Sequence, residues 1–235
     1  MNDKYIVADN ITKIYGSKDL KVEALKNVSF KIGKGSVTVI LGPSGSGKTT
    51  LLNLLGGMDS LTSGTLLVND INVSNMNKNE LTLYRRNRVG FVFQFYNLMP
   101  NLTALENVEL ATEVCMNTLS PLETIEKVGL SEQKNHFPSQ LSGGEQQRVS
   151  IARALAKNVD LILCDEPTGA LDYETGKNIL EILINTARND NKAVVIVTHN
   201  SAIAKIADQV IYLKDGIINK TVFNKSPMNI MELEW

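Results

Sequence analysis

Gly42-Pro43-Ser44-Gly45-Ser46-Gly47-Lys48-Thr49 is the stretch of sequence that decides the fold. Two glycines five positions apart, followed at once by Lys and Thr, fit the pattern of a phosphate-binding loop. Glycines let the backbone turn so that successive N–H groups point at one anion. In this pattern Lys48 reaches the β- and γ-phosphates of a nucleotide, and the Thr49 hydroxyl is placed to ligate Mg²⁺. The stretch therefore predicts a nucleotide site.

The segments on both sides of the loop support this interpretation. Residues 36–41 form a β-branched run bounded by glycine, which is typical of a buried strand. Residues 50–55 have the composition of a helix, so the loop delivers the phosphate to a helix N-terminus, and Thr50 joins the predicted site. A Gly/Ser-rich turn that matches by chance is the alternative, and the flanking strand and helix argue against it.

The composition limits the class of protein. The 24 Lys and Arg residues balance 25 Asp and Glu residues, so we expect no nucleic-acid partner. Cys115 and Cys164 are the two cysteines, far apart and without metal-like spacing, which indicates a reducing compartment. The first residues form no apolar signal region, and no apolar run reaches transmembrane length. We expect a soluble chain whose membrane role comes through a partner.

The order of apolar segments predicts an α/β chain with one helical block. Near-continuous runs at 161–164 and 194–197 are typical of strands buried on both faces. Strand signals stop from about 102 to 157, where apolar positions recur at helical spacing. We expect one domain, with core segments at about 1–94 and 158–224, a helical subdomain at about 95–157 and a short tail at 225–235. Further strands are expected at 5–8, 28–32, 64–69 and 89–93, with a hairpin at 210–218.

The strand at 161–164 ends in two acids, Asp165 and Glu166. At the carboxyl end of a strand beside the phosphate loop, Asp165 can hold the Mg²⁺ that Thr49 ligates, directly or through water. Glu166 lies one residue further out and can orient or deprotonate the attacking water. A solvated acidic turn is the alternative, which the phosphate loop makes a poor explanation.

Leu-Ser-Gly-Gly-Glu at 141–145 allows two interpretations, which are compatible with each other. Ser142 and Glu145 have the spacing of a capping box at a helix start. Gly143 and Gly144 in the first turn cost helix stability, which makes better sense where bare N–H groups meet another anion. The chain thus carries two phosphate-facing elements that lie far apart in sequence.

Together these motifs resemble those of the nucleotide-binding subunit of ABC transporters, over about residues 4–223. The resemblance implies a P-loop NTPase (RecA-like) core of the ABC ATPase type, with an antiparallel β edge, the inserted helical subdomain, and ATP with Mg²⁺ as ligands. It also implies a head-to-tail dimer of two copies. In that dimer the signature residues Ser142, Gly143, Gly144 and Glu145 of one chain close on the nucleotide held by the phosphate loop of the other.

The same resemblance implies four further roles. Tyr15 resembles the aromatic residue that stacks on adenine, although an ordinary surface tyrosine is the alternative. Gln94 resembles the glutamine that senses Mg²⁺ and the attacking water. Asp172 resembles the aspartate that communicates across the dimer, and His199 the switch histidine that contacts the γ-phosphate. One departure is Asn200, where many relatives have Asp.

Apolar residues after Gln94 predict the membrane partner. In the family this loop borders the groove that receives a cytoplasmic helix of the permease, so the chain would lie at the inner face of the membrane. Packing between the core and the helical block is the alternative explanation for these side chains. The residues expected at the groove are Phe95, Tyr96, Leu98 and Met99.

Residues 17–23, 54–59, 94–100 and 105–108 resemble the branch that contains the MacB macrolide exporters, the LolD lipoprotein-release ATPases and FtsE of cell division. The resemblance implies a motor subunit for a separate permease, whose cargo the permease selects. An FtsE-like regulator without cargo is the first alternative. A soluble ABC ATPase of DNA repair or ribosome work is the second, but the coiled-coil insertion, tandem cassette and basic surface usual in that class are absent from the sequence.

Overall fold

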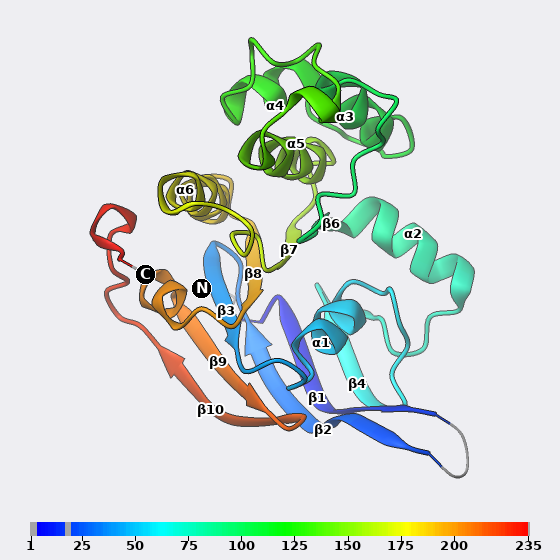
Figure 1. The fold of residues 1–235 in the computed structure, drawn as a ribbon. Coiled ribbons are helices and arrows are strands. Elements are labelled where there is room, and N and C mark those ends of the chain that lie inside the picture. The colour runs from blue at the N-terminus through cyan, green and yellow to red at the C-terminus, as the bar shows by residue number, and fades with distance from the viewer. Residues whose placement is uncertain (1–3, 17–19, 235) are drawn as a thin grey trace.

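A six-stranded sheet forms the centre of the computed structural model, which describes residues 4–16 and 20–234 (Figure 1). Its strand order is β10-β9-β3-β8-β7-β6, and every neighbouring pair is parallel except β9 with β10. The bounds are β3 (Ser36–Leu41), β6 (Val89–Val92), β7 (Leu161–Asp165), β8 (Ala193–Thr198), β9 (Gln209–Lys214) and β10 (Ile217–Phe223). The predicted strand runs in this part of the chain are confirmed.

Burial of both faces of strand β8 explains why its sequence is continuously apolar. Val194 and Ile196 belong to a core shared with α5 (Gly143–Ala156) and α6 (Tyr173–Asn189). Val195 and Val197 point into a second core, which contains α1 (Lys48–Leu55) and the antiparallel sheet. Because side chains alternate between the faces of a strand, both sets must be apolar.

The second sheet has four antiparallel strands in the order β2-β1-β4-β5. Strands β1 and β2 are longer than the segments expected at 5–8 and 28–32, which is a correction. Asn10 and Asn27 adopt positive φ angles near irregularities in the β1–β2 register, so bulges carry the strands through residues that read as a polar loop. Residues 17–19 of the stretch 17–23 lie outside the described residues. The bounds are β1 (Ile6–Tyr15), β2 (Val22–Ile32), β4 (Ser63–Val68) and β5 (Ile71–Asn72).

Helices occupy most of the stretch at about 95–157, as predicted, and this block lies above α6 in Figure 1. Helix α2 (Lys78–Arg88) precedes this block and was not predicted, because Tyr84 is its one buried residue and no apolar period appears. Its start was readable, since Asn77 and Glu80 form a capping box. The other elements here are α3 (Ala104–Glu113), α4 (Pro121–Lys127) and the short helix η1 (Pro138–Gln140). Across the described residues, every helix is too short or too polar to span a lipid bilayer.

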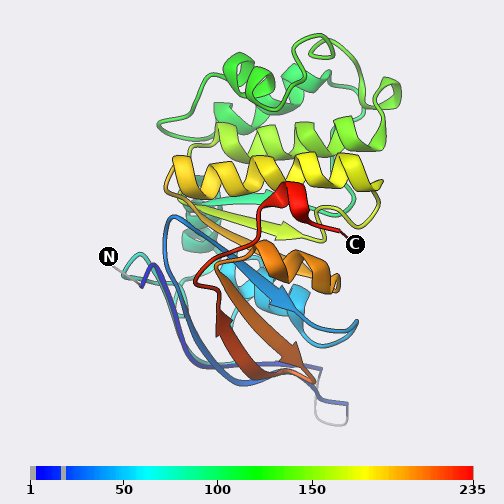
Figure 2. The same cartoon turned by 90° about the vertical axis from the view of Figure 1, so that its left-hand side faces the viewer.

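The segment after β10 packs against α6 rather than trailing away (Figure 2). Leu233 is fully buried in the core that contains α6, and the Tyr173 hydroxyl donates to its carbonyl oxygen. This segment includes η3 (Ile230–Glu232), and η2 (Ser201–Ile206) precedes β9. Strand β10 is an exposed edge strand whose pairing with β9 shifts between Ile218 and Lys220.

Candidate nucleotide site

The phosphate loop joins β3 to α1, and its last glycine sets the geometry. Gly47 is the N-cap of α1 with φ 99°, a left-handed conformation that favours glycine. A Cβ at this position would lie 2.5 Å from the carbonyl oxygen of Ala24. Gly47 provides no side-chain cap, and no acidic residue lies in the first turn of α1. The N–H groups of that turn are therefore suited to an anion.

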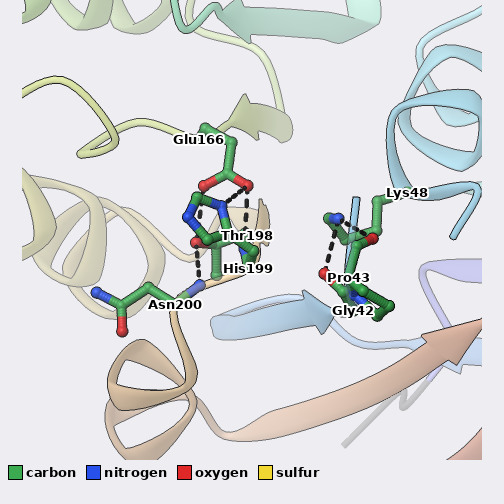
Figure 3. Close-up of polar contacts among 7 residues, drawn as sticks. All are labelled: Gly42, Pro43, Lys48, Glu166, Thr198, His199 and Asn200. Carbon is green, nitrogen blue, oxygen red and sulfur yellow. Dashed lines mark hydrogen bonds and ion pairs between the residues drawn. The ribbon is translucent and has the colours of Figure 1, made fainter. Parts of the chain in front are cut away.

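Lys48 folds back over this loop. Its Nζ donates to the carbonyl oxygens of Gly42, at 2.8 Å, and Pro43, at 2.9 Å (Figure 3). Phosphate oxygens make stronger, charge-assisted hydrogen bonds with an ammonium group than these neutral carbonyls do. A hollow beside the loop also takes in Lys26 of β2 and the Asp215-Gly216 turn, which the sequence analysis did not assign to the site.

Thr49 and Asp165 lie together, as the sequence predicted. The Thr49 side chain lies near the Asp165 carboxylate at the end of β7, close enough to affect its pKa. Burial and then the charge of Glu166 raise the pKa of Asp165, against the nearby Thr49 side chain and the charge of Lys48. Too little positive charge therefore surrounds the Asp165 carboxylate to hold its pKa at the usual value.

Glu166 connects β7 to the end of β8 (Figure 3). Its Oε1 accepts from the backbone N–H of His199 at 3.0 Å and lies 2.7 Å from His199 Nδ1. Its Oε2 accepts from the Thr198 hydroxyl at 2.9 Å, and the Thr198 oxygen accepts from the backbone N–H of Asn200 at 3.0 Å. The two residues predicted from separate strands, Glu166 and His199, are thus in direct contact.

Gln94 lies close to the same turn. Its Nε2 is 3.7 Å from the position of a Cβ built on Gly169, and the Cβ of Glu166 is 3.4 Å from that position. Tyr15 is at the far end of β1, where its hydroxyl donates to Asp59 at 2.7 Å and lies near the Thr50 side chain. Asp59 was not among the predicted site residues.

The signature turn is built as the capping box that the sequence indicated. Ser142 Oγ accepts from the backbone N–H of Glu145, while Glu145 Oε2 accepts from Ser142 N and Oγ at 2.8 Å each. The hydrogen bond from the Ser142 N–H is the main cause that lowers the pKa of Glu145. A Cβ at Gly144 would lie 2.3 Å from the methyl group of Thr175, so tight packing of α5 on α6 also requires this glycine.

Neither the signature turn nor Asp172 lines the hollow beside the phosphate loop. Asp172 is the N-cap of α6 and accepts from the backbone N–H of Thr175 at 3.0 Å. A single chain thus brings the phosphate loop, Asp165, Glu166 and His199 to the carboxyl ends of neighbouring parallel strands. The signature turn is left at the start of α5.

Known proteins share this sequence and fold. The family model described as ABC transporter matches residues 25–169. The ABC transporter ATP-binding protein MJ0796 of Methanocaldococcus jannaschii is 46% identical over 220 residues, covering 90% of this chain and 94% of that protein. The macrolide export ATP-binding/permease protein MacB of Bradyrhizobium diazoefficiens is 42% identical over 223 residues, or 93% of this chain. This chain covers 34% of that MacB.

A solved structure supports the fold assignment. It is a dimeric structure of a post-hydrolysis state of the cassette MJ0796, bound to ADP and Pi. It matches with a TM-score of 0.85 and 43% identity, covering 93% of this chain and 98% of that one. The fold expected from the sequence, a P-loop core of the ABC ATPase type, is confirmed. The chain therefore belongs to the ABC transporter family, as an ATP-binding, ATP-hydrolysing subunit.

Proposed function

We propose that this chain is the motor of a separate membrane permease and works as a dimer closed around two ATP molecules. The supporting observation is the incomplete site of one chain, in which the signature turn lies apart from the phosphate loop. A second copy, placed head to tail, would bring its Ser142, Gly143 and Gly144 to the γ-phosphate. Solved structures of the relative MJ0796 are dimeric.

Thr49, Asp165 and Gln94 are proposed to hold Mg²⁺ together with the ATP phosphates. Hydroxyl, carboxylate and amide oxygens are the hard ligands that Mg²⁺ prefers. Within residues 4–16 and 20–234 no group of three or more His, Cys, Asp or Glu side chains could hold a metal, so phosphate oxygens and water would complete the shell. When bound, Mg²⁺ neutralises charge on the β- and γ-phosphates.

The other side chains are proposed to divide the hydrolysis between them. The N–H groups of the phosphate loop and Lys48 orient the triphosphate. Glu166 accepts the proton of the attacking water, and the hydrogen bonds to its two oxygens fix the orientation of the carboxylate. His199 contacts the γ-phosphate from the other side of Glu166, Asp172 links the two copies, and Tyr15 stacks on adenine.

A groove between the core and the helical block is the proposed docking surface for the permease. It is lined by apolar and cationic side chains from both parts, including Met58, Phe91, Phe93, Val114 and Arg153. In the loop after Gln94, Phe95 and Met99 are 80% and 50% exposed. The groove lining includes Asn97 of this loop but neither Phe95 nor Met99, and Leu98 packs on the core. Arg153 of α5 donates to the carbonyl oxygens of Tyr96 and Asn97, which ties this loop to the helix that starts at the signature. Docking would hold the chain at the inner face of the cell membrane.

Sedimentation velocity tests the dimer. The Glu166→Gln variant, which should bind ATP and hydrolyse it slowly, is expected to shift from monomer to dimer when ATP and Mg²⁺ are added. Adding Ser142→Arg to it should prevent the shift, because a bulky cation replaces the small side chain at the closing turn. A monomer under every nucleotide condition, alone and with the permease, would contradict the proposal.

A further inference from the structure

Lys13, Asp59 and Tyr15 form a cluster at the end of β1 that has no part in the hydrolysis contacts above. Lys13 Nζ donates to Asp59 Oδ1 at 2.5 Å and to the carbonyl oxygen of Ser60 at 2.7 Å. The Tyr15 hydroxyl donates to the other carboxylate oxygen, Oδ2, at 2.7 Å. One carboxylate thus holds an ammonium group on one oxygen and a phenol on the other.

The charged pair in this cluster, Lys13 and Asp59, is partly buried, so its pairing affects stability. The side chains of Lys13 and Asp59 are 10% and 27% exposed. Burial alone would raise the pKa of Asp59, but the hydrogen bonds from Lys13 and Tyr15 outweigh it and hold the pKa below its usual value. A partly buried charge of this kind is costly unless it is paired, so removing one member disturbs the others.

The Tyr15 ring is fixed by these contacts in two ways. Asp59 fixes the position of its hydroxyl, and the Lys13 ammonium lies 4.8 Å from the ring centroid, in cation–π range. The ring is nevertheless 40% exposed, so it remains open to a ligand. An aromatic surface held in place before binding loses little conformational entropy when a planar group stacks on it.

The cluster also ties the ring to the helix of the phosphate loop. The Tyr15 hydroxyl lies near the Thr50 side chain, in the first turn of α1. Asp59 follows the other end of that helix, and the N–H groups of Met58 and Asp59 both donate to the carbonyl oxygen of Asn53. Both ends of α1 therefore contribute to the position of Tyr15, which sets the distance between the ring and the phosphate loop.

We propose that Asp59 and Lys13 are positioning residues that hold the Tyr15 ring as a platform for the base of the nucleotide. The inference rests on the proposed function, since the phosphates must bind the loop at 42–49. This proposal divides the binding free energy of ATP into a contribution from the phosphates and a contribution from the base. Asp59 and Lys13 act on the contribution from the base alone, and they act through Tyr15.

Calorimetric titration of the full chain with two ligands tests this separation. The ligands are ATP and inorganic triphosphate, each with Mg²⁺, because triphosphate has no base. Asp59→Asn removes the charge and keeps the size of the side chain. We expect it to weaken ATP binding about 5- to 20-fold, a fraction of what base stacking contributes, and to change triphosphate binding less than twofold.

A double-mutant cycle tests whether Asp59 acts through the ring. In a Tyr15→Ala background, Asp59→Asn should have no further effect on the affinity for ATP. Asp160→Asn is the matched control, because Asp160 is 33% exposed and pairs with Lys34 at 2.9 Å outside the nucleotide site. It should leave both affinities unchanged.

The outcomes are distinct. Equal losses for ATP and triphosphate, or additive losses in the Tyr15→Ala background, would show that the cluster only braces α1 and would overturn the inference. If Asp59→Asn does not fold, Tyr15→Phe repeats the test, since it removes only the hydroxyl link: ATP binding should weaken and triphosphate binding should not. A parent chain that binds neither ligand would overturn the proposed function itself. A parent that binds both equally well would overturn only the role of the ring.

Discussion

Several hydrogen bonds hold Glu166 in position for its proposed role in hydrolysis. Its φ of 46° lies in the left-handed region, which is unfavourable for a residue other than glycine. Hydrogen bonds from His199 N–H and the Thr198 hydroxyl hold its carboxylate, and its own N–H donates to the carbonyl oxygen of Val197. The strained backbone is therefore fixed from several sides, with the carboxylate beside His199.

Replacing Glu166 by Gln should slow ATP turnover about 10²- to 10⁴-fold, because an amide cannot accept the proton of the attacking water. The amide keeps the size of the side chain and one accepting oxygen, so the site should keep its shape and ATP binding should persist. Phosphate release is measured at matched nucleotide occupancy. Glu181→Gln, on the exposed side of α6, is the control and should keep parental turnover. Turnover of the Glu166 variant within a few-fold of the parent would remove the residue from this role.

Asn200 stands where many relatives carry aspartate, and its side chain caps a helix as an aspartate would. It is the N-cap of η2, and its Oδ1 accepts from the backbone N–H of Ala202 at 2.9 Å. Asn and Asp cap about equally well, so Asn200→Asp should change the free energy of unfolding by less than about 0.5 kcal/mol, whereas Asn200→Ala should lower it by about 1 kcal/mol. Urea denaturation distinguishes the two. Equal effects of both variants would mean that the cap contributes nothing.

Among the helices and strands, the sequence predicted those whose apolar pattern follows directly from which of their faces are buried. Strands β7 and β8 are buried on both faces, so their apolar runs were unambiguous. Helix α2 buries only Tyr84, and β1 passes through bulges near Asn10, so neither has a periodic pattern to read. Contacts such as Tyr15 with Asp59 join residues 44 positions apart and follow from the fold alone. Motif spacing could predict that Thr49 lies near Asp165, but it could not predict contacts such as that of Tyr15 with Asp59.

The segment after β10 was expected to be a short tail, and its packing leads to a stability prediction. Leu233 is fully buried, and Lys177 Nζ donates to the carbonyl oxygen of Met231 beside it. Leu233→Ala should lower the free energy of unfolding by about 2 kcal/mol, through lost apolar burial and the cavity left behind. Met231→Ala, at an exposed position, should change it by less than about 0.5 kcal/mol. Chemical denaturation of both variants is the measurement, and equal values would show that the segment does not stabilise the fold.

At the scale of the whole molecule, the loop after Gln94 connects three parts: the hydrolysis site, α5 and the proposed docking groove. Met99→Glu should leave ATP binding by the isolated chain intact, because this exposed side chain is not in the nucleotide site. It should weaken retention on membranes that carry the permease, since it puts a charge on an apolar contact surface.

Co-purification with the permease measures this effect, with hydrolysis followed in the same preparation. Phe223→Glu is the control, because Phe223 is also an exposed apolar side chain, 70% exposed against 50% for Met99, but lies on the edge strand β10 and not in the loop after Gln94. If Met99→Glu co-purifies at parental stoichiometry and supports the activity of the permease, the docking surface lies elsewhere. Leu98 is unsuitable for this test, since it packs on the core.

The irregular pairing of β10 also has a consequence for aggregation, because β10 is an exposed edge strand. An exposed sheet edge is a ready template for a strand of a neighbouring chain, and uncontrolled stacking of that kind leads to aggregates. Here the edge is interrupted by the shift between Ile218 and Lys220, and the Lys220 ammonium lies over the ring of Tyr212, 4.3 Å from its centroid. A charge and a register shift in the middle of Ile217–Phe223 make this edge a poor template for a further strand.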